Sequence, residues 1–135
     1  MKFPKKYIKH GDYVLHSGQR SDTLYDVNEM ITDEQELQKI LNAFPWQVDT
    51  CVGIATGGAI IASHMIRYGM NFVMFKDGEL KGQIQGSYCL VDDVVTTEAS
   101  IREALKIIGI KPRYIFVVVD RRRKKVLKIN SMFLK

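Results

Sequence analysis

Two adjacent carboxylates, Asp92 and Asp93, follow a run of apolar residues, and several hydroxyl side chains follow the carboxylates. At the end of a buried strand the two charges repel each other and lose hydration, so they need cations or hydroxyl groups as partners. The segment 94–100 leads into a helical pattern, which brings free backbone N–H groups and the positive end of the helix to one point. The hydroxyl groups at this point belong to Thr96, Thr97 and Ser100. We interpret this segment as a phosphate-binding loop, and the alternative is a strand-end Asp pair followed by a threonine helix cap.

The elements around this loop are predicted from the hydrophobic pattern. Strands are expected over residues 49–54, 71–75, 87–92 and 113–120, and helices over 32–44, 60–65 and 98–108. The first helix is expected to start with a capping box at Thr32 and to stop before Pro45. Strands that are apolar along their length and alternate with helices indicate an α/β fold, with a mainly parallel sheet covered on both faces. Residues 13–27 are expected to form a hairpin outside this sheet.

In such sheets, ligands bind beyond the carboxyl ends of the strands. The polar residues there lie in segments 55–58, 76, 92–100 and 120–121. Some of them have simpler explanations: Gly57 and Gly58 could form only a tight turn, and Lys76 could be a solvated lysine. Arg121 opens the run RRRKK, and such runs are usually solvated or bind nucleic acid.

Length and composition narrow the class of protein. The 135 residues are expected to form one domain, 1–135, and the 46% of hydrophobic residues allow a packed core. The sequence shows no membrane-length apolar run and no signal peptide, so we expect a cytoplasmic protein without membrane contact. Cys51 and Cys89 are expected to be buried free thiols. The net charge of +5 fits a protein that handles anions, without choosing which.

The segment 90–100, LVDDVVTTEAS, resembles the motif by which type I phosphoribosyltransferases bind 5-phosphoribosyl 1-diphosphate (PRPP). Other segments resemble orotate phosphoribosyltransferases in particular. These are LHSGQRSDTLYD at 15–26, like that family's N-terminal hairpin, GIATGGA at 53–59, like its diphosphate loop, and VVVDR at 117–121. The resemblance implies the type I phosphoribosyltransferase fold with a small hairpin hood. It also implies a homodimer that makes orotidine 5′-phosphate in pyrimidine synthesis.

The resemblance also implies roles for individual residues. Asp92 and Asp93 are expected to hold the ribose hydroxyls and, partly through PRPP and water, Mg²⁺, and both are expected catalytic residues. Orotate is expected to contact Thr96 and Arg121, whose forked guanidinium suits a carboxylate. His16, which replaces a lysine common in the family, is also an expected orotate contact, and the alternative is a surface imidazole without a role. The expected PRPP contacts are Thr56, Gly57, Gly58, Lys76, Asp92, Asp93, Val94, Val95, Thr96, Thr97, Glu98, Ala99 and Ser100.

Two departures from the family pattern bear on activity. Glu98 and Ala99 stand where the family has glycine, and we expect Glu98 to point outward, because a carboxylate facing a bound phosphate is repelled. The loop 76–86 is shorter than the family's mobile loop, which covers the active site of the neighbouring subunit, and it has no histidine. Lys81 is the basic residue left in it for catalysis.

Three functions are therefore compared. The leading hypothesis is an orotate phosphoribosyltransferase with Mg²⁺ as cofactor, and the second is a phosphoribosyltransferase for another base. The third is a regulator that keeps the nucleotide pocket and binds RNA through residues 121–125, although nucleic acid is not the expected partner.

Overall fold

The computed structural model describes residues 2–135, which form two β-sheets. A two-stranded antiparallel hairpin consists of β1 (Ile8–Val14) and β2 (Arg20–Tyr25). A six-stranded sheet has the order β5-β4-β3-β6-β7-β8, and only β5 runs antiparallel to its neighbour. Its strands are β3 (Thr50–Ile54), β4 (Asn71–Lys76), β5 (Glu79–Lys81), β6 (Tyr88–Val95), β7 (Tyr114–Asp120) and β8 (Asn130–Leu134). The predicted α/β fold with a mainly parallel sheet is confirmed.

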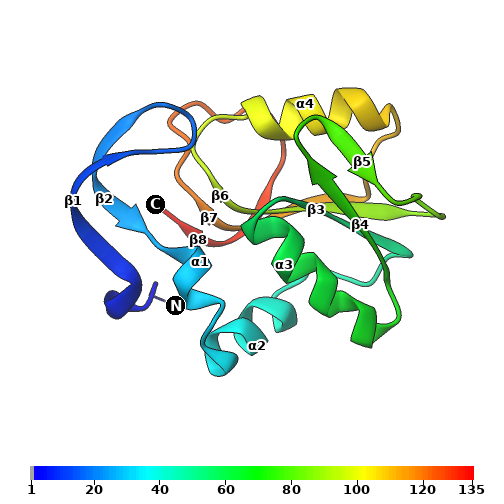
Figure 1. The fold of residues 1–135 in the computed structure, drawn as a ribbon, viewed down its shortest axis with the longest axis horizontal. Helices are drawn as coiled ribbons and strands as arrows, with labels where there is room; N and C mark the ends of the chain where they lie inside the picture. The colour runs from blue at the N-terminus through cyan, green and yellow to red at the C-terminus, as the bar shows by residue number, and fades with distance from the viewer. Residues whose placement is uncertain (1) are drawn as a thin grey trace.

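Helices cover both faces of the large sheet, with α4 on one side and α2 and α3 on the other (Figure 1). Alternate residues of β7 pack toward opposite faces, as the pleat of a strand requires. Phe116 and Val118 belong to the core beneath α1–α3, whereas Ile115 and Val117 belong to the core beneath α4. The helices are η1 (Lys5–Tyr7), α1 (Val27–Met30), α2 (Glu34–Asn42), α3 (Gly57–Ser63), η2 (His64–Tyr68) and α4 (Ala99–Ile108). No helix within residues 2–135 is both long and apolar enough to cross a membrane.

The start of α2 differs from the prediction by one residue. Asp33 is the N-cap, and its carboxylate accepts a hydrogen bond from the Gln35 N–H at 3.1 Å. The Thr32 hydroxyl instead donates to the carbonyl oxygen of Glu29 at 2.6 Å. The Thr32 side chain therefore binds the end of the short helix α1, which the hydrophobic pattern did not predict. The expected capping box at Thr32 is wrong.

The order in which the chain adds strands to the sheet reverses between β3 and β6, although these two strands are parallel neighbours. From β3 the chain passes through α3 to β4 on one side, and β6 lies on the other side of β3. Loops that leave the carboxyl ends of two such strands diverge and open a crevice, which is the usual ligand position in open α/β sheets. The loops in question are 55–56, between β3 and α3, and 96–98, between β6 and α4.

Several elements lie outside the predicted pattern. The hairpin begins at Ile8 rather than Tyr13, and β8 adds a parallel edge strand beside β7. The segment 76–86, expected to be a loop, turns at Asp77 and Gly78 and returns as β5. Cys51 and Cys89 are buried free thiols, as predicted, and their sulfur atoms lie 3.6 Å apart across β3 and β6.

Candidate functional site

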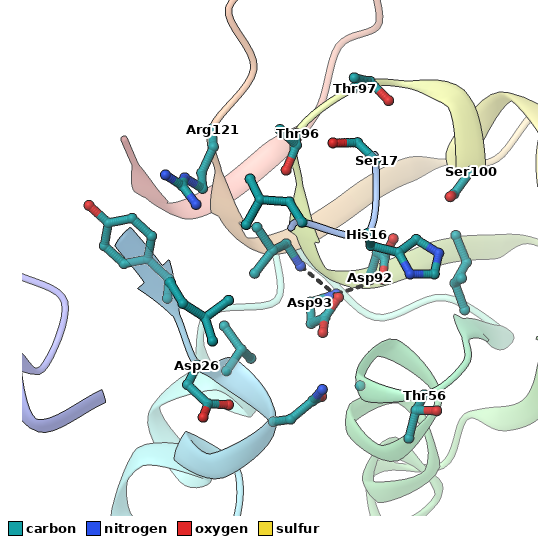
Figure 2. Close-up of a pocket in the computed structure, with 18 of the residues that line it drawn as sticks. His16, Ser17, Asp26, Thr56, Asp92, Asp93, Thr96, Thr97, Ser100 and Arg121 are labelled. Carbon is teal, nitrogen blue, oxygen red and sulfur yellow. Dashed lines mark hydrogen bonds between the residues drawn. The ribbon is translucent and has the colours of Figure 1, made fainter. Parts of the chain in front are cut away.

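A cavity of about 540 Å³ opens at this crevice, between the β1–β2 hairpin, the loop after β3 and the loop after β6. Its volume suits a ligand of nucleotide size. Figure 2 shows polar side chains from all three segments around it. The lining residues that the sequence singled out are His16, Thr56, Gly57, Asp92, Asp93, Val94, Thr96, Thr97, Ala99, Ser100 and Arg121. The predicted residues outside this lining are Gly58, Lys76, Lys81, Val95 and Glu98.

Asp92 and Asp93 stand at the end of β6 and line the cavity together. One Asp92 oxygen accepts the Asp93 N–H at 2.8 Å, and one Asp93 oxygen accepts the Val94 N–H at 2.7 Å. Burial and the adjacent charge of Asp93 raise the pKa of Asp92 well above its usual range. The remaining oxygens have unused acceptor capacity, so the pair is suited to hydroxyl groups or a cation.

Two glycines allow the loop after β3 to lie directly against this pair. A Cβ atom on Gly57 would come within 2.6 Å of an Asp93 carboxylate oxygen. A Cβ atom on Gly58 would come within 2.4 Å of the Val91 carbonyl oxygen. Gly57 thus shapes the cavity wall, whereas Gly58 packs behind it against the backbone of β6. The glycines are required by close approach, which goes beyond the tight turn considered from the sequence.

The segment 94–100, here called the phosphate loop, runs from the end of β6 into α4. The Thr97 hydroxyl accepts a hydrogen bond from the Ala99 N–H at 3.5 Å, and α4 begins at Ala99. The first N–H groups of a helix have no partner within the helix, and they carry its partial positive charge. Thr96, Thr97 and Ser100 line the same cavity (Figure 2). This arrangement fits a bound phosphate.

Glu98 points away from the cavity, as expected, but it is not on the surface. Its exposed fraction is 8%, and its carboxylate binds the Arg122 guanidinium at 2.6 Å and the Arg102 guanidinium at 2.7 Å. It also accepts the N–H groups of Val126 and Leu127. Both carboxylate oxygens are therefore bound away from the cavity, and the PRPP contact expected at position 98 stays a prediction.

Arg121 follows β7 and lines the cavity near the hairpin. Its guanidinium donates to the Thr23 carbonyl oxygen and to the Ser21 hydroxyl, both at 3.1 Å, and lies 4.9 Å from the centre of the Tyr25 ring. Arg121 thus connects the sheet to the hairpin. Unlike its neighbours 123–125, it is not a solvated member of the basic run.

Arg122 also departs from the expected solvated run. It is 7% exposed, and its guanidinium binds Asp120 through two nitrogens, at 3.0 and 2.8 Å. The exposed members of the run are Arg123, Lys124 and Lys125. Any nucleic-acid surface here would therefore use these three residues rather than Arg122.

Lys76 and Lys81 lie outside the cavity lining. Lys76 is exposed at the end of β4. Lys81 is exposed on β5, at the edge of the sheet, and pairs with Glu79 at 2.9 Å. The diphosphate role of Lys76 and the catalytic role of Lys81 stay predictions.

The hairpin turn and the start of α1 supply cavity residues that were not singled out from the sequence. Among them are Ser17 of the turn, Asp26, which is the N-cap of α1, and Asn28 of α1. Asp26 caps α1 by accepting the Glu29 N–H at 3.0 Å, and it pairs with Lys9 at 3.3 Å. The family resemblance of segment 15–26 indicated that this region contributes to the site. It did not single out these residues, because the spacing of the hydroxyl and carboxyl groups there is not typical of a binding site.

The donor set at the cavity fits a Mg²⁺ ion that the protein would hold only in part. Asp92 and Asp93 offer carboxylate oxygens, which Mg²⁺ prefers. Residues 2–135 contain no cluster of three or more His, Cys, Asp or Glu side chains suited to a metal. The ion would therefore take most of its ligands from water and from a phosphorylated substrate, as Mg²⁺ commonly does.

The chain is similar to known proteins in sequence and in fold. No family model matches the chain. The orotate phosphoribosyltransferase of Picrophilus torridus is 33% identical over 146 residues, covering 94% of this chain and 87% of its own length. The crystal structure of orotate phosphoribosyltransferase from Aeropyrum pernix has a TM-score of 0.80 at 24% identity, covering 96% of this chain and 89% of that one. The transcriptional regulator GfcR 2 of Methanosarcina barkeri is 34% identical over 94 residues, which cover 56% of this chain and 46% of the regulator.

Proposed function

The chain belongs to the orotate phosphoribosyltransferase family, and we propose that it transfers the phosphoribosyl group of PRPP to orotate, giving orotidine 5′-phosphate and diphosphate. One observation carries the proposal. The Asp92–Asp93 pair, the phosphate loop and the Arg121 guanidinium all line one cavity of nucleotide size. These groups match the hydroxyls, the phosphate and the carboxylate that the two substrates present.

The binding mode follows from the charges around the cavity. The 5′-phosphate of PRPP binds the phosphate loop, where free N–H groups and the hydroxyls of Thr96, Thr97 and Ser100 meet. Asp92 and Asp93 accept hydrogen bonds from the ribose hydroxyls. The diphosphate lies toward Thr56 and Gly57, where glycine leaves the backbone open to a ligand.

The reaction displaces diphosphate from C1 of the ribose by a nitrogen atom of orotate. Positive charge develops on the ribose ring as the C1–oxygen bond breaks, and the carboxylates of Asp92 and Asp93 stabilise that charge in a partly buried cavity. Arg121 holds the orotate carboxylate through its forked guanidinium. Its contacts with Thr23 and Ser21 keep the hairpin over the cavity, which limits access of water to C1.

Mg²⁺ is part of the proposal. Asp92 and Asp93 would hold the ion together with PRPP oxygens and water. When bound, it supplies positive charge that stabilises the leaving diphosphate. A bound metal would also favour the ionised form of Asp92. In the free protein, burial and the charge of Asp93 raise the pKa of this side chain.

A homodimer is also proposed. Ile60, Ile66 and Tyr68 are large apolar side chains on α3 and η2 that are 41%, 57% and 40% exposed. Large exposed apolar side chains on two consecutive helices favour a contact with another subunit. Sedimentation equilibrium of the wild type and of Ile66→Lys checks this, and a monomeric wild type contradicts it.

A panel of bases tests the choice of acceptor. Orotate, uracil, adenine, guanine and hypoxanthine are each incubated with PRPP, Mg²⁺ and the protein, and diphosphate release is measured. We expect release with orotate to exceed release with each other base by at least about tenfold. If another base is preferred, the transferase chemistry stands but orotate is the wrong acceptor.

Partial similarity to a transcriptional regulator favours a second candidate, in which the pocket senses a ligand and the chain binds nucleic acid. Arg123, Lys124 and Lys125 are exposed and would bind phosphates. Binding of RNA and of duplex DNA is measured at rising salt for the wild type and for Arg123→Ala/Lys124→Ala/Lys125→Ala. No binding at low salt rules this candidate out. The variant leaves Arg122 intact, so a loss of binding does not reflect a loss of the fold.

A further inference from the structure

Three charged side chains are buried together behind the cavity, where β7, the segment 121–129 and the start of α4 meet. Asp120 is 2% exposed, Arg122 is 7% exposed and Glu98 is 8% exposed. We call these three residues the buried charge cluster. None of them lines the cavity described above. Charged residues are rarely buried this far, so the cluster requires a physical reason.

Each charge in the cluster has close partners. Arg122 binds both carboxylate oxygens of Asp120, at 3.0 and 2.8 Å, and its backbone N–H donates to the same carboxylate. The remaining guanidinium nitrogen donates to Glu98 at 2.6 Å and to the Leu127 carbonyl oxygen at 2.8 Å. The other Glu98 oxygen binds Arg102 at 2.7 Å. Arg122 thus joins an acid at the end of β7 to an acid at the start of α4.

The cluster flanks two parts of the proposed site. Arg121 stands between Asp120 and Arg122, so the turn that the Asp120 carboxylate closes also sets the direction of Arg121. The Arg121 N–H donates to the Val95 carbonyl oxygen at 2.8 Å, directly before Thr96. Glu98 lies at the other end of this short stretch, as the N-cap of α4. Figure 2 shows Arg121 and Thr96 facing the cavity from these neighbouring strand ends.

We infer that the buried charge cluster is a positioning device, which holds the phosphate loop and Arg121 in one fixed relation so that phosphate and base bind at the spacing of a single nucleotide. The inference rests on the proposed function for the identity of the base, but phosphate binding at the loop does not depend on that identity. The three residues of the buried charge cluster act through Arg121 and the phosphate loop, and they contact neither substrate. Glu98 therefore gains a role at the position where the sequence departs from the family's glycine.

Stability alone does not explain such a cluster. Removal of one partner leaves an uncompensated buried charge, but removal of all the charges is often neutral or stabilising. A purely structural role and a positioning role therefore predict different results for a variant without any of the three charges. The structural role predicts normal ligand binding wherever the fold is intact. The positioning role predicts weak binding in a protein that melts like the wild type.

The test uses Asp120→Asn/Arg122→Met/Glu98→Gln, the single variant Glu98→Gln, and Arg102→Met as the matched control. The control removes the outer partner of Glu98 but leaves the link between Glu98, Arg122 and Asp120. Ribose 5-phosphate binding is measured by calorimetry, and hydrogen exchange is followed at residues 21–25, which Arg121 holds. The KM and kcat for orotate and PRPP are then measured.

For the triple variant we expect a melting temperature close to that of the wild type. We expect ribose 5-phosphate to bind about tenfold or more weakly and exchange at 21–25 to accelerate, because a shift of about 1 Å in a positioned group has effects of this size. The KM for orotate rises by a similar factor, and Arg102→Met stays within about threefold of the wild type on every measure.

The inference is overturned if the triple variant folds and binds ribose 5-phosphate within about threefold of the wild type, with unchanged exchange at 21–25. It is also overturned if Arg102→Met behaves like the triple variant. If the triple variant does not fold, Glu98→Gln decides by the same two measurements. Neither measurement requires turnover, so a wild type that does not convert orotate defeats the proposed function and leaves this test intact.

Discussion

The Arg121 guanidinium donates a hydrogen bond of 3.1 Å to the carbonyl oxygen of Thr23, a residue 98 positions earlier in the chain. This bond and the one to Ser21 hold the hairpin against the end of β7. The side chain that is proposed to bind orotate therefore also closes the cavity. A planar fork can serve both tasks at once, whereas an ammonium group cannot.

We therefore expect Arg121→Lys to raise the KM for orotate by roughly 10- to 100-fold, because a hydrogen bond to a charged group contributes about 1.5–3 kcal/mol. The KM for PRPP should change by less than about threefold. Steady-state kinetics with each substrate varied in turn checks both values. Arg123→Lys is the matched control, because Arg123 is an exposed arginine of the same run. An unchanged KM for orotate in Arg121→Lys would show that Arg121 does not bind the base.

We expect the Asp92–Asp93 pair to make the free protein less stable at neutral pH than at acidic pH. Burial and the charge of Asp93 raise the pKa of Asp92, so the stability that its protonated form contributes is present below its ordinary value of 3.8. This contribution is lost as the pH rises through the raised pKa. We expect Asp92→Asn to raise the free energy of unfolding of the ligand-free protein at pH 7 by about 1 kcal/mol, which corresponds to a rise in melting temperature of roughly 3–5 °C. Activity should fall. Calorimetry at pH 4 and pH 7 checks this, and an equal shift at both values would contradict the assigned cause.

Gly58 is expected to tolerate no side chain. A Cβ atom there would lie 2.4 Å from the Val91 carbonyl oxygen, which belongs to the backbone and cannot rotate away. We expect Gly58→Ala to lower the free energy of unfolding by at least about 1–3 kcal/mol and to weaken PRPP binding. Gly11→Ala is the control, since the atoms nearest to its Cβ would belong to the Tyr13 side chain, at 3.3 Å or more, and not to the backbone. Equal urea midpoints for the two variants would contradict the account of the close approach.

The buried charge cluster predicts a loss of stability in acid. Burial opposes the charge of Glu98, but the N–H groups of Val126 and Leu127 and two arginines outweigh it, and the pKa falls to about 2. The pKa of Asp120 is lowered too, because Arg122 outweighs its burial. Because the pKa of Glu98 is lowered, its ionised carboxylate contributes its full stabilisation above the ordinary pKa of 4.5. This contribution is lost as the pH falls toward 2.

Urea unfolding between pH 6 and pH 2.5 measures this loss. We expect the wild type to lose more stability than Glu98→Gln over this range, because the variant has no carboxylate at position 98 to protonate. Glu103→Gln, an exposed change on the same helix, should follow the wild type. Parallel curves for the wild type and Glu98→Gln would show that Glu98 does not carry the acid response.

The sequence predicts those parts of the fold whose signal is local. The apolar run in β7 and the helical spacing in α4 are both evident from neighbouring residues, and both elements lie within one residue of the predicted bounds. Helix α1 is too short for a periodic pattern to appear. Strand β8 lies at the sheet edge with mixed burial, and only its pairing with β7, distant in sequence, identifies it.

The site divides in the same way. Asp92, Asp93 and the hydroxyls of the phosphate loop could be predicted because they are close in sequence and their chemistry requires a partner. The burial of Glu98 could not, because its partner Arg122 lies 24 residues away within a run that is otherwise exposed. The contact of Arg121 with the hairpin depends on tertiary packing in the same way.

The most direct test of the central claim is the conversion of orotate to orotidine 5′-phosphate by the wild type in the presence of PRPP and Mg²⁺. The double variant Asp92→Asn/Asp93→Asn is measured beside it. Each reaction is repeated with a chelator, and product is quantified by chromatography at high protein concentration. We predict turnover by the wild type that the chelator abolishes, and at least about a hundredfold lower rate for the double variant, since two charges that stabilise the transition state are removed. No orotidine 5′-phosphate from the wild type, or equal rates for the two proteins, would contradict the account.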